Sequence, residues 1–260
     1  GGNIIDDEEK LKNFLDQFAT IKYKEDKGEV KKILVHGGGK LATKMAEDLQ
    51  VPQRMIDGRR ITDSETLKIV TMVYAGYVNK NIVAQLGARG CTVLGLSGAD
   101  GNLIQAHKRI TATSVDYGFV GDVDFINTDL LQLLLGKELS IVIAPITHNN
   151  EGQLLNTNAD TIAQEIAKAL SPYYNTQLIY SFEKEGVLAE VQDDASVIKK
   201  MDAKLYTQLK EEKAIFAGMI PKLDNAFTAL QSGVSKVIIG KAEKLHQLIE
   251  GTSGTTISNE

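Results

Sequence analysis

The chain has little cysteine and no long apolar run, and both absences limit what it can be. Among its 260 residues Cys91 is the only cysteine, so no intrachain disulfide can form, which fits a reducing cytosol. Cys91 lies in an apolar run with no activating neighbour in the sequence, so we expect a buried core thiol rather than a nucleophile. No apolar run approaches the roughly 20 residues that cross a bilayer, and no basic-then-apolar secretion signal opens the chain. We therefore expect a cytoplasmic protein with no membrane partner.

Excess positive charge is absent too. The chain has 29 Lys and Arg against 34 Asp and Glu, a net charge of −5. A groove that binds nucleic acid needs a broad excess of Lys and Arg, so we expect no nucleic-acid partner. The four histidines, His36, His107, His148 and His246, lack the spacing of a zinc site, and no protein metal site is predicted. His36 and His148 each follow an apolar strand, and a structural role is favoured over a ligand-facing one for both.

Short β-rich runs alternate with amphipathic helical runs along the chain, as expected for a mostly parallel sheet with helices on both faces. Strands are predicted at 32–35, 92–96, 140–146, 177–180 and 236–239, and helices at 6–18, 40–49, 64–86, 130–135, 160–170, 203–212, 222–230 and 241–249. Residues 102–124 are interpreted as hairpins, 187–198 as a loop or hairpin, and 251–257 as a possible edge strand. Such sheets bind ligands outside the carboxyl ends of their strands.

Three consecutive glycines, Gly37, Gly38 and Gly39, follow the first predicted strand and precede a helix. Glycine N–H groups at a helix N-terminus attract anions, so the loop could cradle a carboxylate or a phosphate. A tight turn with no ligand is the alternative. The spacing fits neither the P-loop nor the dinucleotide-binding glycine pattern.

Two arginines, Arg59 and Arg60, stand just before the longest predicted helix, which Thr62 or Asp63 could cap. A guanidinium binds a carboxylate through two parallel hydrogen bonds, so one of them could hold a substrate carboxylate. A solvated pair with Asp57 or Asp63 is equally compatible with the spacing.

Polar groups gather at two further helix starts. Asn156, Asn158 and Asp160 crowd one of them, where a single N-cap residue would suffice. We expect them to orient a substrate amide and catalytic lysines, with capping by Asn158 or Asp160 as the alternative. Lys222 follows Gly218 and Pro221 at the other start, where a positive charge opposes the helix dipole and stabilisation of a phosphoryl group would explain it.

In order and spacing these segments resemble the acetylglutamate kinases, a branch of the amino-acid-kinase family, along nearly the whole chain. The matching segments are Val35–Gly39, Gly58–Thr62, Gly118–Val123, Leu155–Asp160, Gly218–Lys222 and Gly254–Ile257. The resemblance implies an α/β fold, an open and mainly parallel αβα sandwich. Residues 1–171 would form an N-terminal lobe for N-acylglutamate and dimerisation, and 172–260 a C-terminal lobe for ATP.

The resemblance also implies a reaction and the residues that serve it. The reaction is ATP-dependent phosphorylation of the γ-carboxylate of N-acetyl-L-glutamate in arginine biosynthesis, by a homodimer, with Mg²⁺ held through the ATP phosphates. The implied roles are substrate binding by Gly37, Gly38, Arg60, Asn156 and Asn158, catalysis by Lys222, Asp160 and Gly2, and nucleotide binding by Glu183, Gly186 and Lys222.

Two segments depart from the family pattern. Family members usually carry a lysine two residues before the first Gly-Gly, on the opening strand, whereas this sequence starts at Gly1-Gly2, so we expect that the sequence is cut short there. Phe182–Gly186 replaces a Thr/Ser-Asp-Val-x-Gly type segment, with Glu183 as the substitute for the Asp.

Several alternatives remain. N-succinylglutamate is the main alternative acceptor, with carbamate, aspartate, free glutamate or UMP as others on the same fold. A non-catalytic amino-acid sensor would fit the missing lysine. A dinucleotide oxidoreductase is disfavoured by the glycine spacing.

Overall fold

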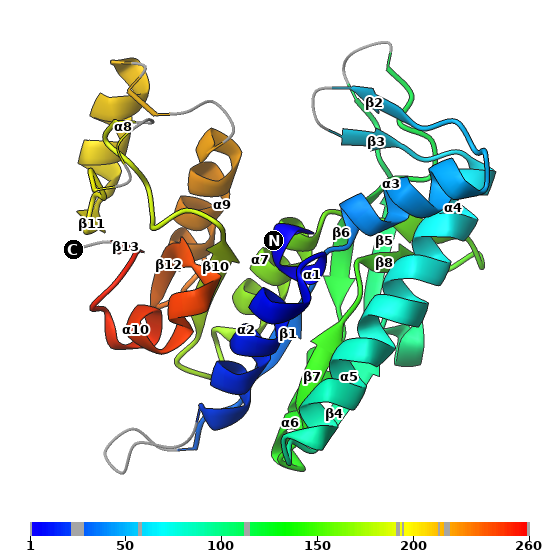
Figure 1. Cartoon of the computed structure of the whole chain (residues 1–260), viewed down its shortest axis with the longest axis horizontal. Coiled ribbons are helices and arrows are strands. Elements are labelled where there is room, and N and C mark those ends of the chain that lie inside the picture. Colours follow the sequence, from blue (N-terminus) through cyan, green and yellow to red (C-terminus); the bar gives the residue numbers. More distant parts are fainter. Residues whose placement is uncertain are drawn as a thin grey trace.

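The first sheet is fully parallel and lies at the centre of the N-terminal half (Figure 1). This computed structural model describes residues 2–21, 29–56, 59–111, 115–190, 193, 195–212, 214–215 and 219–258. The strand order is β1-β7-β4, with β1 at Ile33–Val35, β7 at Ser140–Ile143 and β4 at Val93–Leu96. Val35 and Leu96 both pair with Ile143, so the three carboxyl ends coincide at one edge of the sheet. That edge carries the glycine loop.

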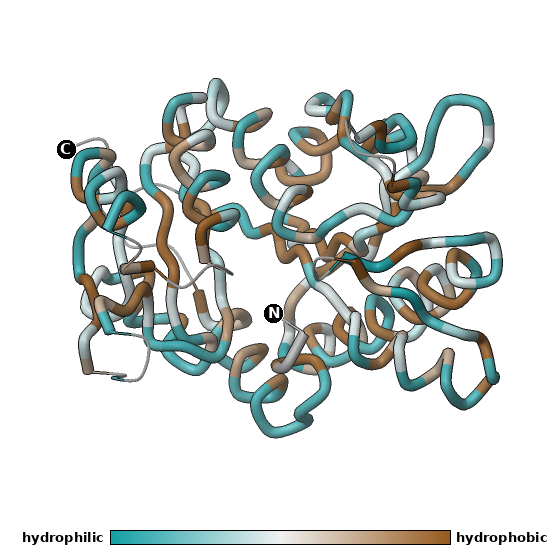
Figure 2. Tube along the Cα trace, turned by 90° about the horizontal axis from the view of Figure 1, so that it is seen from above, coloured by the Kyte–Doolittle hydropathy of each residue, from teal (hydrophilic) through white to brown (hydrophobic). Residues whose placement is uncertain are grey.

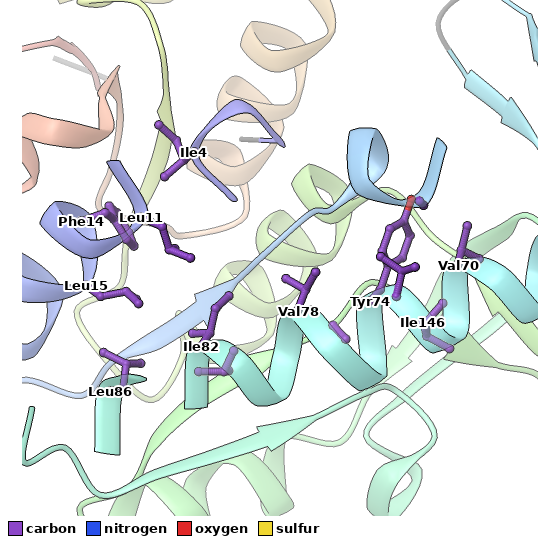
Figure 3. Close-up of a cluster of buried hydrophobic side chains, with 14 of the residues drawn as sticks. Ile4, Leu11, Phe14, Leu15, Val70, Tyr74, Val78, Ile82, Leu86 and Ile146 are labelled. Atoms are coloured by element: carbon purple, nitrogen blue, oxygen red, sulfur yellow. The ribbon is translucent and has the colours of Figure 1, made fainter. Parts of the chain in front are cut away.

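Helices cover both faces of this sheet because its central strand alternates between two cores. Ile141 and Ile143 of β7 point into one cluster with α6 (Thr128–Gly136) and α7 (Ala159–Leu170). Val142 points into the other, with α2 (Glu8–Thr20), α3 (Gly39–Asp48) and α5 (Asn79–Ala88), part of which is drawn in Figure 3. The predicted mainly parallel αβα arrangement is confirmed.

A second sheet has the order β10-β12-β13-β11. Its strands are β10 (Gln177–Phe182), β12 (Lys236–Lys241), β13 (Thr255–Ile257) and β11 (Lys200–Met201). The β10–β12 pair is parallel and places Phe182 beside Lys241 at its carboxyl end. α8 (Ala203–Glu211) and α9 (Ile220–Gln231) contribute to the core on one side of this sheet, and α10 (Leu245–Glu250) contacts β12. Hydrophobic stretches gather inside the molecule in Figure 2.

Two smaller sheets lie beyond the carboxyl ends of the strands of the first sheet, on the side of the glycine loop (Figure 1). A four-stranded sheet has the order β6-β5-β8-β9, with β5 (Ile104–Lys108) and β6 (Gly121–Ile126) as an antiparallel pair that confirms the predicted hairpin. β8 is Ile146–His148 and β9 is Leu154–Asn156. The hairpin of β2 (Arg54–Ile56) and β3 (Arg59–Ile61) lies beside α3 and α4 (Ser64–Thr71) in Figure 1.

Three sequence predictions were wrong in detail. The strand expected at 140–146 is broken, because Pro145 has no N–H and the chain turns between β7 and β8. The tail strand is not at an edge, since β13 lies between β12 and β11. The last helix begins later than Lys241, which is the final residue of β12 and is followed by a 3₁₀ turn at Ala242–Lys244.

The long predicted helix 64–86 is present but is not α-helical throughout. Asp63 caps it by accepting the Thr66 N–H at 2.8 Å, as one of the two predicted caps. Met72–Val78 forms a π-helical segment between α4 and α5, and Gly76 lies inside it. No helix in the described ranges is long and apolar enough to cross a membrane.

Candidate active site

The glycine loop connects β1 to α3, as predicted. Gly38 has φ of 152°, and a Cβ there would lie 2.9 Å from Cδ1 of Tyr74, so both backbone conformation and space require glycine. A Cβ on Gly37 would meet nothing within 4 Å, which leaves the space above the loop open. No described group accepts a hydrogen bond from the N–H of Gly37 or Gly38. The loop therefore presents unused donors next to a helix N-terminus.

Arg60 extends from β3 to the first turn of α3. Its Nη2 donates to the Gly39 carbonyl at 2.9 Å and to Thr43 Oγ1 at 2.8 Å, and its Nη1 donates to Gln53 Oε1. All three acceptors are neutral, and none of the ion pairs between described residues includes Arg60. The structure thus brings a positive charge beside the glycine loop and leaves that charge unneutralised.

The alternative interpretation paired these arginines with Asp57 or Asp63. Within the described ranges Asp63 forms no such pair and is instead the N-cap of α4. Asp57 and Gly58 lie outside the described residues.

Asn156, on β9, connects three distant segments. Its Nδ2 donates to Thr62 Oγ1 at 3.0 Å and its backbone N–H donates to the Phe119 carbonyl at 2.8 Å. Phe119 N–H in turn donates to the Thr62 carbonyl at 2.6 Å. The end of β3, the segment before β6 and β9 are therefore linked near Arg60.

Gly118 makes that linkage possible. Its φ is +71°, and a Cβ would lie 2.2 Å from the Thr62 carbonyl oxygen. This accounts for a glycine at the start of the Gly118–Val123 segment, since no other residue fits the close approach.

Asp160 and Lys222 meet at the N-termini of α7 and α9. Lys222 Nζ forms an ion pair with Asp160 Oδ2 and lies 5.6 Å from the centre of the Tyr180 ring. Tyr180 donates its hydroxyl to the Asp160 carbonyl at 3.3 Å, and burial together with the Asp160 charge raises the pKa of Tyr180. The two predicted residues are thus adjacent although 62 positions separate them, while Gly218 lies outside the described residues.

Asn158 has the structural role that was the alternative prediction. Its Oδ1 accepts the Thr161 N–H at 3.1 Å, which makes it the N-cap of α7. Its predicted contact with substrate stays a prediction.

The predicted nucleotide residues lie at the carboxyl end of β10. Glu183 is exposed directly after the strand. Gly186 is buried, and a Cβ there would lie 2.8 Å from Thr255 Oγ1 and from Val197 Cγ1. Packing against β13 therefore demands this glycine, and the nucleotide roles of Glu183 and Gly186 stay predictions.

Gly2, to which the resemblance assigns a catalytic role, lies in the short helix α1 (Gly2–Ile5). α1 contacts both α3 and β10, so it lies between the two sheets. Ile4 is buried in the core, which explains why the segment is held there. Gly1 lies outside the described residues.

Sequence reasoning missed two sets of contacts next to the site, those of Glu185 and those of His36. Glu185 binds Lys241 at 3.3 Å and Lys244 at 2.7 Å, and the two ammonium groups lower the pKa of its carboxyl. His36 is 4% exposed and contacts Asn79, so the side chain is buried as its structural role requires. Burial alone does not explain why this residue is a histidine. Only the apolar strand before His36 signalled its burial; its partner is 43 residues away and gives no sequence signal.

Comparison with known proteins gives one consistent result. A sequence model of the amino acid kinase family matches residues 1–241. Acetylglutamate kinase of Parabacteroides distasonis is 51% identical over 247 residues, covering 95% of this chain and 94% of that protein. Acetylglutamate kinase of Methanopyrus kandleri is 36% identical, with 94% of each chain covered.

Solved structures agree. The crystal structure of smu.665 from Streptococcus mutans aligns with a TM-score of 0.73 at 27% identity, covering 94% of this chain and 96% of that one. N-acetylglutamate synthase from Neisseria gonorrhoeae aligns with a TM-score of 0.80 at 20% identity, covering all of this chain and 58% of that one, which shows a shared fold. With its family match over residues 1–241 and its relatives over nearly the full length, this chain belongs to the amino acid kinase family.

Proposed function

We propose that this chain transfers the γ-phosphoryl group of ATP to the γ-carboxylate of N-acetyl-L-glutamate, forming N-acetylglutamyl 5-phosphate for arginine biosynthesis. The observation that carries the proposal is the unneutralised Arg60 charge beside the unused N–H donors of Gly37 and Gly38. A positive charge and two free donors suit a dianionic acceptor such as an N-acylglutamate. The relatives at about 50% identity that are named acetylglutamate kinases support the same acceptor.

The acceptor would lie over the N-terminal lobe, residues 1–171. Arg60 would bind its α-carboxylate, and the glycine loop would receive its γ-carboxylate. Asn156 and Asn158 would face the acylated amino group, since amide side chains can pair with an amide ligand. Thr62 and Gly118 support this placement because they hold β3 and β9 together.

ATP would lie over the C-terminal lobe, residues 172–260, near Glu183 and Gly186 at the carboxyl end of β10. A γ-carboxylate oxygen attacks the γ-phosphorus, and the bond from that phosphorus to the β–γ bridging oxygen breaks to release ADP. Lys222 faces the charge that develops on the transferring group, and Asp160 with the Tyr180 ring fixes the position of its ammonium. Gly2 on α1 would complete the site between the lobes.

Mg²⁺ fits this site through the nucleotide. Among Lys222, Asp160 and Tyr180 the carboxylate is that of Asp160, and it is already paired with Lys222, so the ATP phosphates would hold the ion. When bound, it neutralises phosphate charge and orients the phosphates.

The proposal includes a cytoplasmic homodimer. Met72 and Tyr77 are 56% and 65% exposed on the outer side of the π-helical segment, and β4 is an edge strand of the first sheet with Leu94 37% exposed. Exposed apolar side chains and an uncovered edge strand each favour association with a second copy. The single cysteine suits the cytoplasm.

Trapping the acyl phosphate with hydroxylamine tests the reaction. The protein, with any residues that precede Gly1 in its gene, is assayed with ATP-Mg and N-acetylglutamate, N-succinylglutamate, glutamate or aspartate. Hydroxamate with N-acetylglutamate alone is the expected result. Signal with N-succinylglutamate instead would reassign the acyl group, and ligand binding without any hydroxamate would favour a sensor over an enzyme.

A further inference from the structure

A buried histidine lies directly behind the glycine loop. His36 follows β1, and its backbone N–H donates to the Ile143 carbonyl at 3.2 Å. Its ring Nδ1 is 2.8 Å from the Gly37 carbonyl oxygen, and its Nε2 is 3.2 Å from Nδ2 of Asn79. Both ring nitrogens therefore have partners, and one partner belongs to the loop itself.

The partners determine which nitrogen carries the proton. The Gly37 carbonyl can only accept a hydrogen bond, so Nδ1 is the donor. Asn79 is fully buried, and its Nδ2 donates both to Nε2 and to the Val142 carbonyl at 3.1 Å, while its Oδ1 accepts from Lys80 Nζ at 3.1 Å. Burial lowers the pKa of His36 to about 4, against the raising effect of its bond to Gly37 and with the Lys80 charge adding to the decrease. At neutral pH the ring is uncharged with its one proton on Nδ1.

The hydrogen bond from His36 to the Gly37 carbonyl also fixes the direction of the Gly38 N–H, which points away from His36. The Gly37 C=O and the Gly38 N–H belong to one peptide group, and in a trans peptide they point in opposite directions. None of the described peptide bonds is cis. Holding the carbonyl against His36 therefore directs the Gly38 N–H away from the core, where no described group accepts it.

The same helix that supplies Asn79 supports Gly38 from a second side. Tyr74 Cδ1 and Val78 Cγ2 would lie 2.9 Å and 3.5 Å from a Cβ on Gly38. Tyr74 and Val78 are four positions apart in the π-helical segment and both face Gly38, and Asn79 follows directly as the first residue of α5. Figure 3 shows Tyr74 and Val78 projecting from this helix toward the chain between β1 and α3. The π-helical segment thus brings Tyr74 and Val78 against Gly38, and Asn79 at the start of α5 acts on the loop through His36.

We infer that His36 is a positioning residue for phosphoryl transfer: with Asn79 it fixes the Gly37–Gly38 peptide so that the Gly38 N–H is aimed at the anionic acceptor. The inference relies on the proposed function for the identity of that acceptor only. It gives the buried histidine a task that an apolar residue of similar size could not perform, because only a fixed N–H donor can hold the carbonyl.

Two readouts on the intact protein test it. In ¹⁵N NMR of the unmodified chain, His36 should show a protonated Nδ1 and an unprotonated Nε2, and N-acetylglutamate should shift the Gly38 amide resonance.

In steady-state kinetics, His36→Leu should lower kcat/KM for N-acetylglutamate about 10- to 100-fold with KM for ATP unchanged, which is the loss of one oriented hydrogen bond. His36→Asn keeps a donor near the Nδ1 position and should recover most of the loss. His107→Asn, at a histidine 52% exposed on β5, is the matched control.

Each outcome decides the matter. A proton on Nε2, or wild-type kcat/KM in His36→Leu, overturns the inference. If His36→Leu lowers kcat alone and His36→Asn does not recover it, His36 serves packing only, and this outcome also overturns the inference. If His36→Leu fails to fold, the tautomer of the unmodified chain decides. If the unmodified chain forms no acyl phosphate, the proposed function fails alone, because the tautomer is observed without turnover.

Discussion

At the scale of single residues, the two positive charges of the site are held in different ways. Arg60 binds three neutral acceptors and keeps its full charge for a ligand. Lys222 is paired with Asp160, and the pair is partly exposed, with side-chain exposures of 27% and 36%. Arg60 is therefore suited to attract an anion from solution, whereas Lys222 is suited to a fixed position where charge develops during reaction.

This difference predicts different kinetic losses. Arg60→Ala should raise KM for the acylglutamate about tenfold or more with a smaller effect on kcat, since binding of the α-carboxylate is lost. Lys222→Ala should lower kcat by about 10²- to 10³-fold, the usual effect of removing one group that stabilises transition-state charge. Steady-state kinetics with each substrate varied in turn measures both.

Lys68→Ala serves as the control, because Lys68 is an exposed lysine that pairs with Glu65 one helical turn away. It should change neither constant. A Lys222→Ala chain with normal kcat and raised KM for ATP would assign this lysine to nucleotide binding alone.

Some residue roles could be predicted from the sequence, and others depend on contacts that it does not contain. The excess of polar groups between Asn156 and Asp160 correctly indicated more than a cap, and the structure divides them among a strand contact, the cap and the Lys222 pair. The role of His36 depends on Asn79, and the environment of Arg60 depends on Gln53 and Thr43. Such partners are set by tertiary packing, which local spacing does not encode.

At the scale of elements, length decided what the sequence could predict. Helices with several turns of apolar periodicity were found within a few residues of their observed bounds, because many positions contribute to the signal. The three-residue strands β2, β3 and β9 were missed, since so short a run carries no periodicity, whereas β1, equally short, was predicted because its apolar run leads directly into the glycine loop. The π-helical register was missed too, because it differs from the α-helix by hydrogen bonding rather than by composition.

Gly118 provides the element-scale prediction. Gly118→Ala forces an alanine to φ near +71° with its Cβ against the Thr62 carbonyl, so β3 must separate from the segment before β6. We expect the free energy of unfolding to fall by about 2 kcal/mol or more. Because Asn156 binds Thr62, the KM for the acylglutamate should rise as well. Urea unfolding and steady-state kinetics test the two effects.

Gly87→Ala is the matched control for this change. Gly87 lies in α5, and a Cβ added there would meet nothing within 4 Å, so alanine should stabilise the helix by up to about 1 kcal/mol. Equal loss of stability in both variants would contradict the steric argument at Gly118.

At the scale of the whole molecule, helix α2 connects the layer around the first sheet with that around the second, β10-β12-β13-β11. α2 contacts α5 on the side of the first sheet and both the Ala242–Lys244 turn and α10 on the side of the second. Gln17 makes the polar part of that contact: its Nε2 donates to the Glu243 carbonyl at 2.8 Å, and its Oε1 accepts the His246 N–H at 3.2 Å. Thr20 Oγ1 also lies 2.9 Å from His246 Nε2. One amide side chain therefore satisfies two backbone groups at the other end of the chain, 226 and 229 positions away.

This contact predicts that a change on α2 affects the nucleotide side. Gln17→Leu keeps the side-chain volume but leaves the Glu243 carbonyl and the His246 N–H without that partner, so the free energy of unfolding should fall by about 1–3 kcal/mol. The turn that Gln17 holds directly follows Lys241 and contains Lys244, the two partners of Glu185 beside the predicted ATP site. KM for ATP should therefore rise while KM for the acylglutamate stays unchanged. Gln208→Leu changes an exposed glutamine on α8 whose side chain bonds Glu212 one turn away. It should change stability by less than about 0.5 kcal/mol and neither KM. If the two variants lose the same stability, or if Gln17→Leu alters KM for both substrates equally, then α2 does not transmit its position to the nucleotide side through Gln17.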